Sequence, residues 1–97
     1  MNQIRIVAKA VAKSALRYTP AGTAVLEARF VHESTASEAG LDRTLAFEFS
    51  TVAMGAIGQA LDREPLGASL MLAGFIAPRT RRSMRLVVHI TEYEVTV

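Results

Sequence analysis

The sequence predicts an all-β (mainly β) fold: a five-stranded barrel with a short helix between its third and fourth strands. In five segments, apolar residues either recur at every second position or fill the segment, which is typical of strands with one or two buried faces. Residues 51–64 change to the spacing of a helix. The chain has 97 residues, of which 51% are hydrophobic. This size and composition suit one domain with its own core, spanning residues 1–97.

The first three strands are expected at residues 4–13, 23–33 and 44–50. The charged side chains of the first strand all fall at alternate positions, so one face of this strand should be exposed to solvent. TPAG at 19–22 is a turn signal, because proline fixes φ and glycine accepts positive φ. STASEAGLD at 34–42 has the composition of a polar loop. The side chains expected to point inward are Ala24, Leu26, Ala28, Phe30, His32, Leu45, Phe47 and Phe49.

The helix is expected within residues 51–64, where apolar side chains recur at helical spacing and Pro65 follows. Gly55 and Gly58 should each weaken it by roughly 1 kcal/mol relative to alanine, so a short helix is predicted. The regularly spaced apolar residues are Met54, Ile57 and Leu61, and the candidate N-caps are Ser50 and Thr51.

The fourth strand is expected at residues 68–77. It is apolar on both phases, which favours a central strand or one covered on both faces. The last strand lies within residues 83–95. The order of three strands, a helix and two strands is the layout of an OB-fold barrel, and a plain five-strand meander is the alternative. The inward side chains expected in the last strand are Met84, Leu86, Val88 and Ile90.

Positive charge is concentrated in PRTRRSMR at 78–85, in the loop before the last strand. Four arginines within seven residues repel one another unless a polyanion is present, although a solvated hairpin is the alternative. In OB-folds this loop and the loop joining the first two strands flank the nucleic-acid groove. Arg29 is instead expected to pair with Glu27 on its own face. The candidate residues for binding single-stranded DNA are Arg17, Tyr18, Arg79, Arg81, Arg82 and Arg85, with Lys9 and Lys13 from the first strand.

Other classes of function are disfavoured. The chain has no cysteine, which excludes disulfides and thiolate zinc sites. His32 and His89 lie far apart in the sequence, and no carboxylate pair or activated nucleophile is recognisable, so we expect no metal, no cofactor and no enzyme activity. His32 is expected to be a partly buried, hydrogen-bonded histidine. Charges interrupt the N-terminal apolar stretch, and the apolar run at 65–78 is too short to span a bilayer, so a cytoplasmic protein without a membrane partner is expected.

Three motifs in order resemble the bacterial single-strand DNA-binding protein superfamily: RYTPAGTAV at 17–25, HES at 32–34 and LAGFIAPRTRRS at 72–83. The likeness covers nearly the whole chain. It favours the primosomal members, because ordinary members continue into a long tail with an acidic tip whereas this sequence stops at EYEVTV. The resemblance implies an OB-fold homodimer without enzymatic activity. It also implies binding to single-stranded DNA and to the restart helicase PriA, and to the loader DnaT in cells that contain it.

Two departures from the family pattern predict weak DNA binding that depends on arginine. In the family a tryptophan on the third strand helps to hold the DNA, whereas Ala46 and Phe47 are the nearest residues here. Glu33 replaces an arginine of basic relatives and would repel phosphate. The phenylalanines, Phe75 included, fit core positions better than stacking platforms. One hypothesis is therefore a single-stranded DNA-binding accessory protein of the restart primosome, which stimulates PriA. The alternative is an OB-fold adaptor whose basic hairpin docks a partner and binds little DNA.

Overall fold

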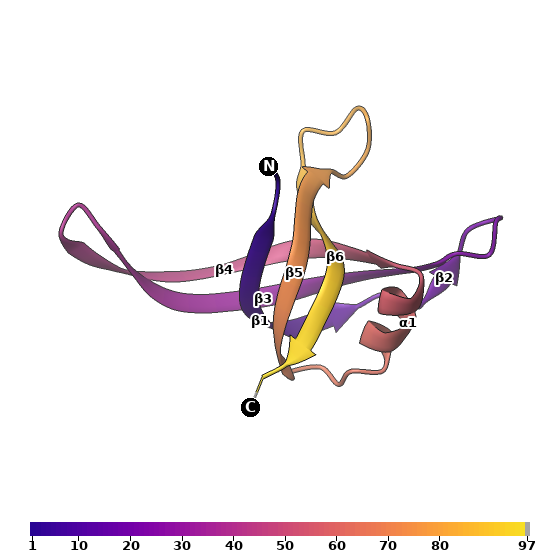
Figure 1. The fold of residues 1–97 in the computed structure, drawn as a ribbon, viewed down its shortest axis with the longest axis horizontal. Helices are drawn as coiled ribbons and strands as arrows, with labels where there is room; N and C mark the ends of the chain where they lie inside the picture. The colour runs from indigo at the N-terminus through magenta and orange to yellow at the C-terminus, as the bar shows by residue number, and fades with distance from the viewer. Residues whose placement is uncertain (97) are drawn as a thin grey trace.

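Five strands close into a barrel in the computed structural model, which describes residues 1–96 (Figure 1). The two-residue strand β2 flanks the barrel, so α1 lies between the third and fourth barrel strands, β4 and β5. This confirms the predicted fold class. Within residues 1–96, no helix has the length and apolar character that a membrane span requires. The elements are β1 (Ile4–Lys13), β2 (Arg17–Tyr18), β3 (Ala24–Glu38), β4 (Leu41–Met54), α1 (Ala56–Asp62), β5 (Ser69–Pro78) and β6 (Leu86–Val95).

The barrel closes because β1 changes partners along its length. From Ile4 to Lys9 it pairs antiparallel with β5, and from Lys9 to Lys13 it pairs antiparallel with β3. A shift in register between Ala10 and Ala12 bends the strand at this change. β6 completes the ring by pairing antiparallel with β5 and parallel with β4.

The core is built from alternate positions of the barrel strands. The inward phase predicted for residues 23–33 is confirmed at Leu26 and Phe30, which are fully buried, but Val25 of the opposite phase is buried as well. Leu70 and Leu72 of β5 are fully buried as well. Alanine at four further core positions lets the strands enclose the large side chains closely. The other buried core residues include Ala8, Ala10, Ala28, Ala53, Leu61, Val88 and Ile90.

The segment predicted as a polar loop at 34–42 is instead the outer part of a long β-hairpin. The ladder between β3 and β4 runs without interruption from Val25↔Met54 to Glu38↔Leu41. Ala39 and Gly40 both have positive φ, 53° and 78°, which suits the two-residue turn of a hairpin. The prediction was wrong because small polar residues still form backbone ladder bonds. The hairpin extends as an arm well beyond the barrel (Figure 1).

The helix is shorter than predicted and begins later. β4 continues to Met54, because Thr51 and Ala53 are buried and pair with β6. Gly55, with φ of 71°, is the N-cap residue of the helix, and no side chain within residues 1–96 forms a capping hydrogen bond there. The hydroxyl of Thr51 donates a hydrogen bond to the Ala28 carbonyl at 3.0 Å, so it is not available as an N-cap.

Four side chains predicted to be inward or in the core are exposed: Phe47, Phe75, Met84 and Leu86. Met84 precedes β6, and Leu86 and Phe47 lie at an end of the barrel that is open in this chain. Phe75 lies on the face of β5 opposite to the buried leucines, where its ring stacks on His89 with centroids 4.9 Å apart. The run of apolar residues in β5 concealed which phase points inward.

Replacing Gly58 should test how tightly α1 packs on the barrel. An added Cβ would lie 2.6 Å from the backbone oxygen of Ala53. We therefore expect Gly58→Ala to destabilise the fold by about 1–3 kcal/mol, because overpacking outweighs the better helix propensity of alanine. Urea unfolding measures the change. Gln59→Ala, at an exposed helical position, is the control and should be neutral or slightly stabilising; equal stability of Gly58→Ala would contradict the packing.

Candidate nucleic-acid interface

Two basic segments that are distant in sequence meet at one side of the barrel. Arg17 and Tyr18 form β2, which pairs with the start of β3. Arg79 and Arg85 delimit the β5–β6 loop, which is closed by a hydrogen bond from the Arg79 N–H to the Arg85 carbonyl at 2.9 Å. A depression of about 410 Å³ lies beside Arg79 and Arg85, between the ends of β1, β3 and β4 that face this loop. Its charged and polar lining consists of Lys13, Ser14, Glu27, Arg29, Ser50, Arg79 and Arg85.

Glu27 lies between the two basic segments. Its carboxylate oxygen Oε1 is 3.4 Å from Nη2 of Arg17 and 3.6 Å from Nη2 of Arg79. The side chains of Arg17, Arg79 and Glu27 are 60%, 47% and 34% exposed, so each ion pair is weak. The expected pairing of Glu27 with Arg29 is wrong. Arg29 instead faces Glu48 across the β3–β4 ladder, at 3.6 Å.

The other arginines of the β5–β6 loop extend into solvent. Arg81 and Arg82 form its turn, as expected for Arg82, and both are exposed. Within residues 1–96, neither forms an ion pair, and nor does Arg85. Tyr18 follows Arg17 in β2 and is 57% exposed. The structure therefore brings Arg17 and the loop arginines to one side of the barrel, whereas the placement of Tyr18 shows only that its ring is accessible.

Lys13 has a structural role that the sequence analysis did not anticipate. Its ammonium donates hydrogen bonds to the backbone carbonyls of Asp62 and Glu64, at 2.8 and 2.7 Å. These carbonyls lie at the C-terminal end of α1, where a cation is favourable. Nearby, the Tyr93 hydroxyl donates to the Glu64 carboxylate at 3.0 Å. Burial raises the pKa of Tyr93, and Glu64 raises it further, so the phenol stays protonated.

Lys9 lies apart from the arginines. It is exposed on β1 beside a separate depression of about 290 Å³, whose lining includes Val31 and Glu33. There β1 leaves β5 and joins β3. The negative charge of Glu33 makes this depression less favourable for phosphate than the one that Arg79 and Arg85 line.

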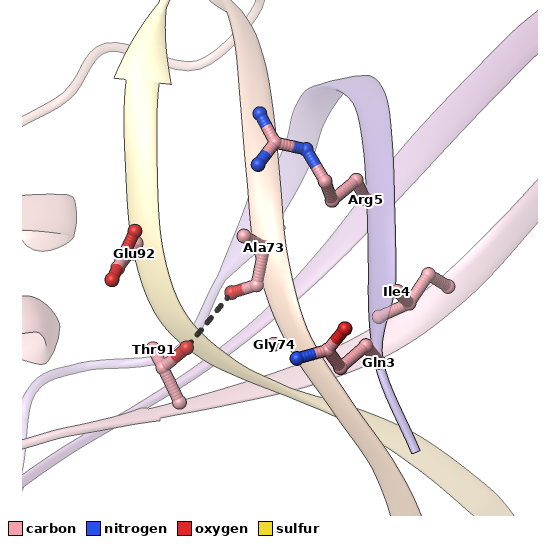
Figure 2. A pocket seen from close by; sticks show the side chains of 7 residues that line it. All are labelled: Gln3, Ile4, Arg5, Ala73, Gly74, Thr91 and Glu92. Atoms are coloured by element: carbon pink, nitrogen blue, oxygen red, sulfur yellow. Dashed lines mark hydrogen bonds between the residues drawn. The ribbon is translucent and has the colours of Figure 1, made fainter. Parts of the chain in front are cut away.

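A further depression, of about 470 Å³, lies on the outer face of β1, β5 and β6 (Figure 2). Figure 2 shows Arg5 and Glu92 on either side of β5, so the charges at its borders have opposite sign. The hydroxyl of Thr91 already donates a hydrogen bond to the Ala73 carbonyl at 3.3 Å. Since none of the candidate DNA-binding residues lines this depression, it is not part of the interface.

The histidine of the HES motif is hydrogen-bonded, as expected. Nδ1 of His32 lies 2.6 Å from the Val7 carbonyl, and Nε2 lies 2.8 Å from Oγ of Ser34. Its ring packs against Phe47, with centroids 5.2 Å apart. His32 thus supplies a partner to β1 where the backbone ladder with β3 has ended.

Comparisons with known proteins find relatives that match nearly the whole chain. A family model described as "another single-strand binding protein family" matches residues 2–92. Replication restart protein PriB of Bordetella pertussis is 36% identical over 92 residues, which cover 95% of this chain and 86% of the relative. PriB of Nitrosomonas europaea is 34% identical over 91 residues, covering 94% and 84%.

Solved structures show the same likeness. The structure of PriB from Ralstonia solanacearum superimposes with a TM-score of 0.91 at 31% identity, covering 100% of this chain and 99% of that one. The single-stranded DNA binding protein from Thermus aquaticus matches with a TM-score of 0.77 at 17% identity, covering 100% of this chain and 50% of that one. At 17% identity, the likeness to the Thermus aquaticus protein shows a shared fold alone.

Replacing Lys13 should reveal its structural role. Lys13→Met keeps the aliphatic stem but leaves two carbonyls at the end of α1 without their charged donor, so we expect a loss of about 1–3 kcal/mol in the free energy of unfolding. Urea unfolding measures it. Lys9→Met, at an exposed position of the same strand, is the control and should change stability by less than about 0.5 kcal/mol. Equal effects of the two changes would contradict the role of the Lys13 ammonium.

Proposed function

Because the chain belongs to the single-strand binding protein family, and within it to the replication restart PriB proteins, we propose that it is an accessory protein of the restart primosome. It binds single-stranded DNA without sequence preference and stimulates the PriA helicase in the cytoplasm. The observation that carries the proposal is the convergence of Arg17 and Arg79 of the β5–β6 loop on Glu27, which lines one depression. Its relatives are not an enzyme family, and the expectation of no enzyme activity is confirmed.

The proposed contact with DNA is mainly electrostatic. Guanidinium groups match phosphate oxygens in geometry and retain their charge at all physiological pH values. Arg17 approaches the backbone from β2, and Arg79, Arg81, Arg82 and Arg85 approach it from the β5–β6 loop. Tyr18 offers an exposed ring on which one base stacks, a contact that tolerates any sequence. Contacts with phosphate and stacking on the face of a base do not depend on the identity of the base, which supports binding without sequence preference.

The adaptor hypothesis remains the second candidate, because Arg81 and Arg82 lie at the tip of the loop rather than in the depression. Phe47, the nearest substitute for the family tryptophan, lines a different, apolar depression. In this alternative the loop docks an acidic surface of PriA, or of DnaT in cells that contain it, and contact with DNA is incidental.

We also propose that the chain forms a homodimer through β1. From Ile4 to Ala8, one edge of β1 has no strand partner within residues 1–96. Such an edge pairs readily with a second copy. Next to it lies a depression of about 220 Å³ whose side chains are apolar except for Ser50. Covering it would bury exposed surface of Phe47, Ile76 and Leu86.

Salt dependence tests the DNA contact. If about three to five phosphates are neutralised per protomer, the logarithm of affinity should fall with the logarithm of salt concentration with a slope of roughly −2 to −3.5. Replacing Arg79 and Arg81 with alanine should flatten the slope by roughly 1 to 1.5 and weaken all sequences about equally. Fluorescence anisotropy of labelled oligo-dT at several salt concentrations measures both values.

The same double variant separates the two hypotheses. In a helicase assay with PriA, it should lose stimulation in proportion to its loss of DNA binding. If it binds oligo-dT like the wild type but no longer stimulates PriA, the loop is a protein-docking element and the adaptor hypothesis is correct. Arg43→Ala, on the distant hairpin arm, is the control for loss of one exposed arginine.

Proline substitution tests the dimer. The Val7 carbonyl points toward His32 and away from β5, so Arg5, two residues earlier, directs its N–H to the same free edge. Arg5→Pro should therefore prevent pairing between copies while leaving the β1–β5 ladder intact. We expect a dimer for the wild type and Arg5→Ala at micromolar concentration, and a monomer for Arg5→Pro, in analytical ultracentrifugation.

A second variant tests the dimer without introducing proline, so that loss of the dimer cannot result from an unfolded strand. Leu86 is 62% exposed in the single chain, so Leu86→Asp should fold, in contrast to what its predicted inward position implied. It should nevertheless weaken the dimer, because it places a charge beside the apolar depression. A monomeric wild type at micromolar concentration would rule out the proposed dimer.

A further inference from the structure

Glu27 stands out because a carboxylate occupies the middle of a surface otherwise suited to phosphate. A single oxygen atom, Oε1, faces Arg17 from β2 and Arg79 from the β5–β6 loop. Both arginines are among the residues that the proposed function assigns to DNA. A carboxylate and a phosphate present similar oxygen acceptors to a guanidinium, so they compete for the same donors.

The backbone holds Glu27 in this position. Its carbonyl accepts one hydrogen bond from the Ser14 N–H at 2.9 Å and a second from the Ser14 hydroxyl at 3.1 Å. The next residue, Ala28, pairs with Lys13 in the β1–β3 ladder. The side chain can change rotamer, but its Cα stays at the floor of the depression, within reach of both basic segments.

We propose that Glu27 is an internal competitor of the DNA backbone, an inference that rests on the proposed function. Without DNA, its carboxylate holds Arg17 and Arg79 together across the depression. When DNA binds, a phosphate takes that place and both ion pairs are broken. Because the pairs are exposed and weak, the exchange is readily made, but the displaced carboxylate stays close to the phosphate and repels it. Glu27 therefore sets an upper limit on affinity for single-stranded DNA.

A role of Glu27 in positioning the two arginines would predict the opposite effect on DNA binding when Glu27 is replaced. If Glu27 only kept the two basic segments in a binding geometry, its loss would let them separate and would weaken DNA binding. Glu27→Gln removes the charge and preserves the size of the side chain, so the fold should be retained. Glu38→Gln is a matched control, because Glu38 also pairs with an arginine, Arg43 at 2.9 Å, but lies on the hairpin arm.

The experiment is anisotropy of labelled oligo-dT with the wild type, Glu27→Gln and Glu38→Gln at low and moderate salt. We expect Glu27→Gln to bind about three- to tenfold more tightly at low salt, the effect of removing one negative charge several ångströms from a phosphate in a partly exposed site. Glu38→Gln should stay within about twofold of the wild type, because it changes only the overall charge.

A double-mutant cycle makes the test specific. Arg17→Ala should cost more affinity in the Glu27→Gln background than in the wild type, because Arg17 no longer has an alternative partner there. If the wild type binds but Glu27→Gln binds equally or more weakly, the competitor role is overturned and the proposed DNA binding stands. If neither protein binds oligo-dT at low salt, both the competitor role and the proposed DNA binding are overturned.

Discussion

Strand β1 pairs with β5 up to Lys9 and with β3 from Lys9 onward, and this change of partner closes the sheet into a barrel. The change requires the strand to bend, and the register shift between Ala10 and Ala12 provides the bend. Alanine is a poor strand former, yet at Ala8 and Ala10 its small side chain lets two neighbouring strands approach the core closely. The low strand propensity of alanine is thus outweighed by the close packing that a closed barrel requires.

The two halves of β1 give the molecule two different surfaces. Before the change of partner, one edge of the strand has no strand partner within residues 1–96, and His32 lies against the Val7 carbonyl there. After it, the pairing with β3 continues to Lys13 and Ala28, and Ser14 binds the Glu27 carbonyl just beyond. The geometry that exposes an edge at one end therefore positions a carboxylate among the arginines at the other.

The order of the barrel strands and the helix, and the buried face of β3, could be predicted from the sequence, because alternation is a local property that survives folding. Leu26 and Phe30 are examples of such positions. Contacts between distant segments could not be predicted in this way. Glu27 was expected to pair with Arg29, but its partners are Arg17 from β2 and Arg79 from the β5–β6 loop, two segments whose meeting depends on barrel closure. The hairpin arm was missed because composition describes side chains, whereas the ladder is made by the backbone.

Net charge describes this surface poorly. The chain carries +2 at pH 7, yet four of its arginines already face a carboxylate: Arg17, Arg29, Arg43 and Arg79. Within residues 1–96, Arg81, Arg82 and Arg85 do not, so three arginines without a carboxylate partner lie together on the β5–β6 loop. A polyanion would be attracted there first and would then have to exchange existing ion pairs in the depression. On the proposed function, the unpaired arginines govern the rate of encounter, whereas the paired ones limit the stability of the complex.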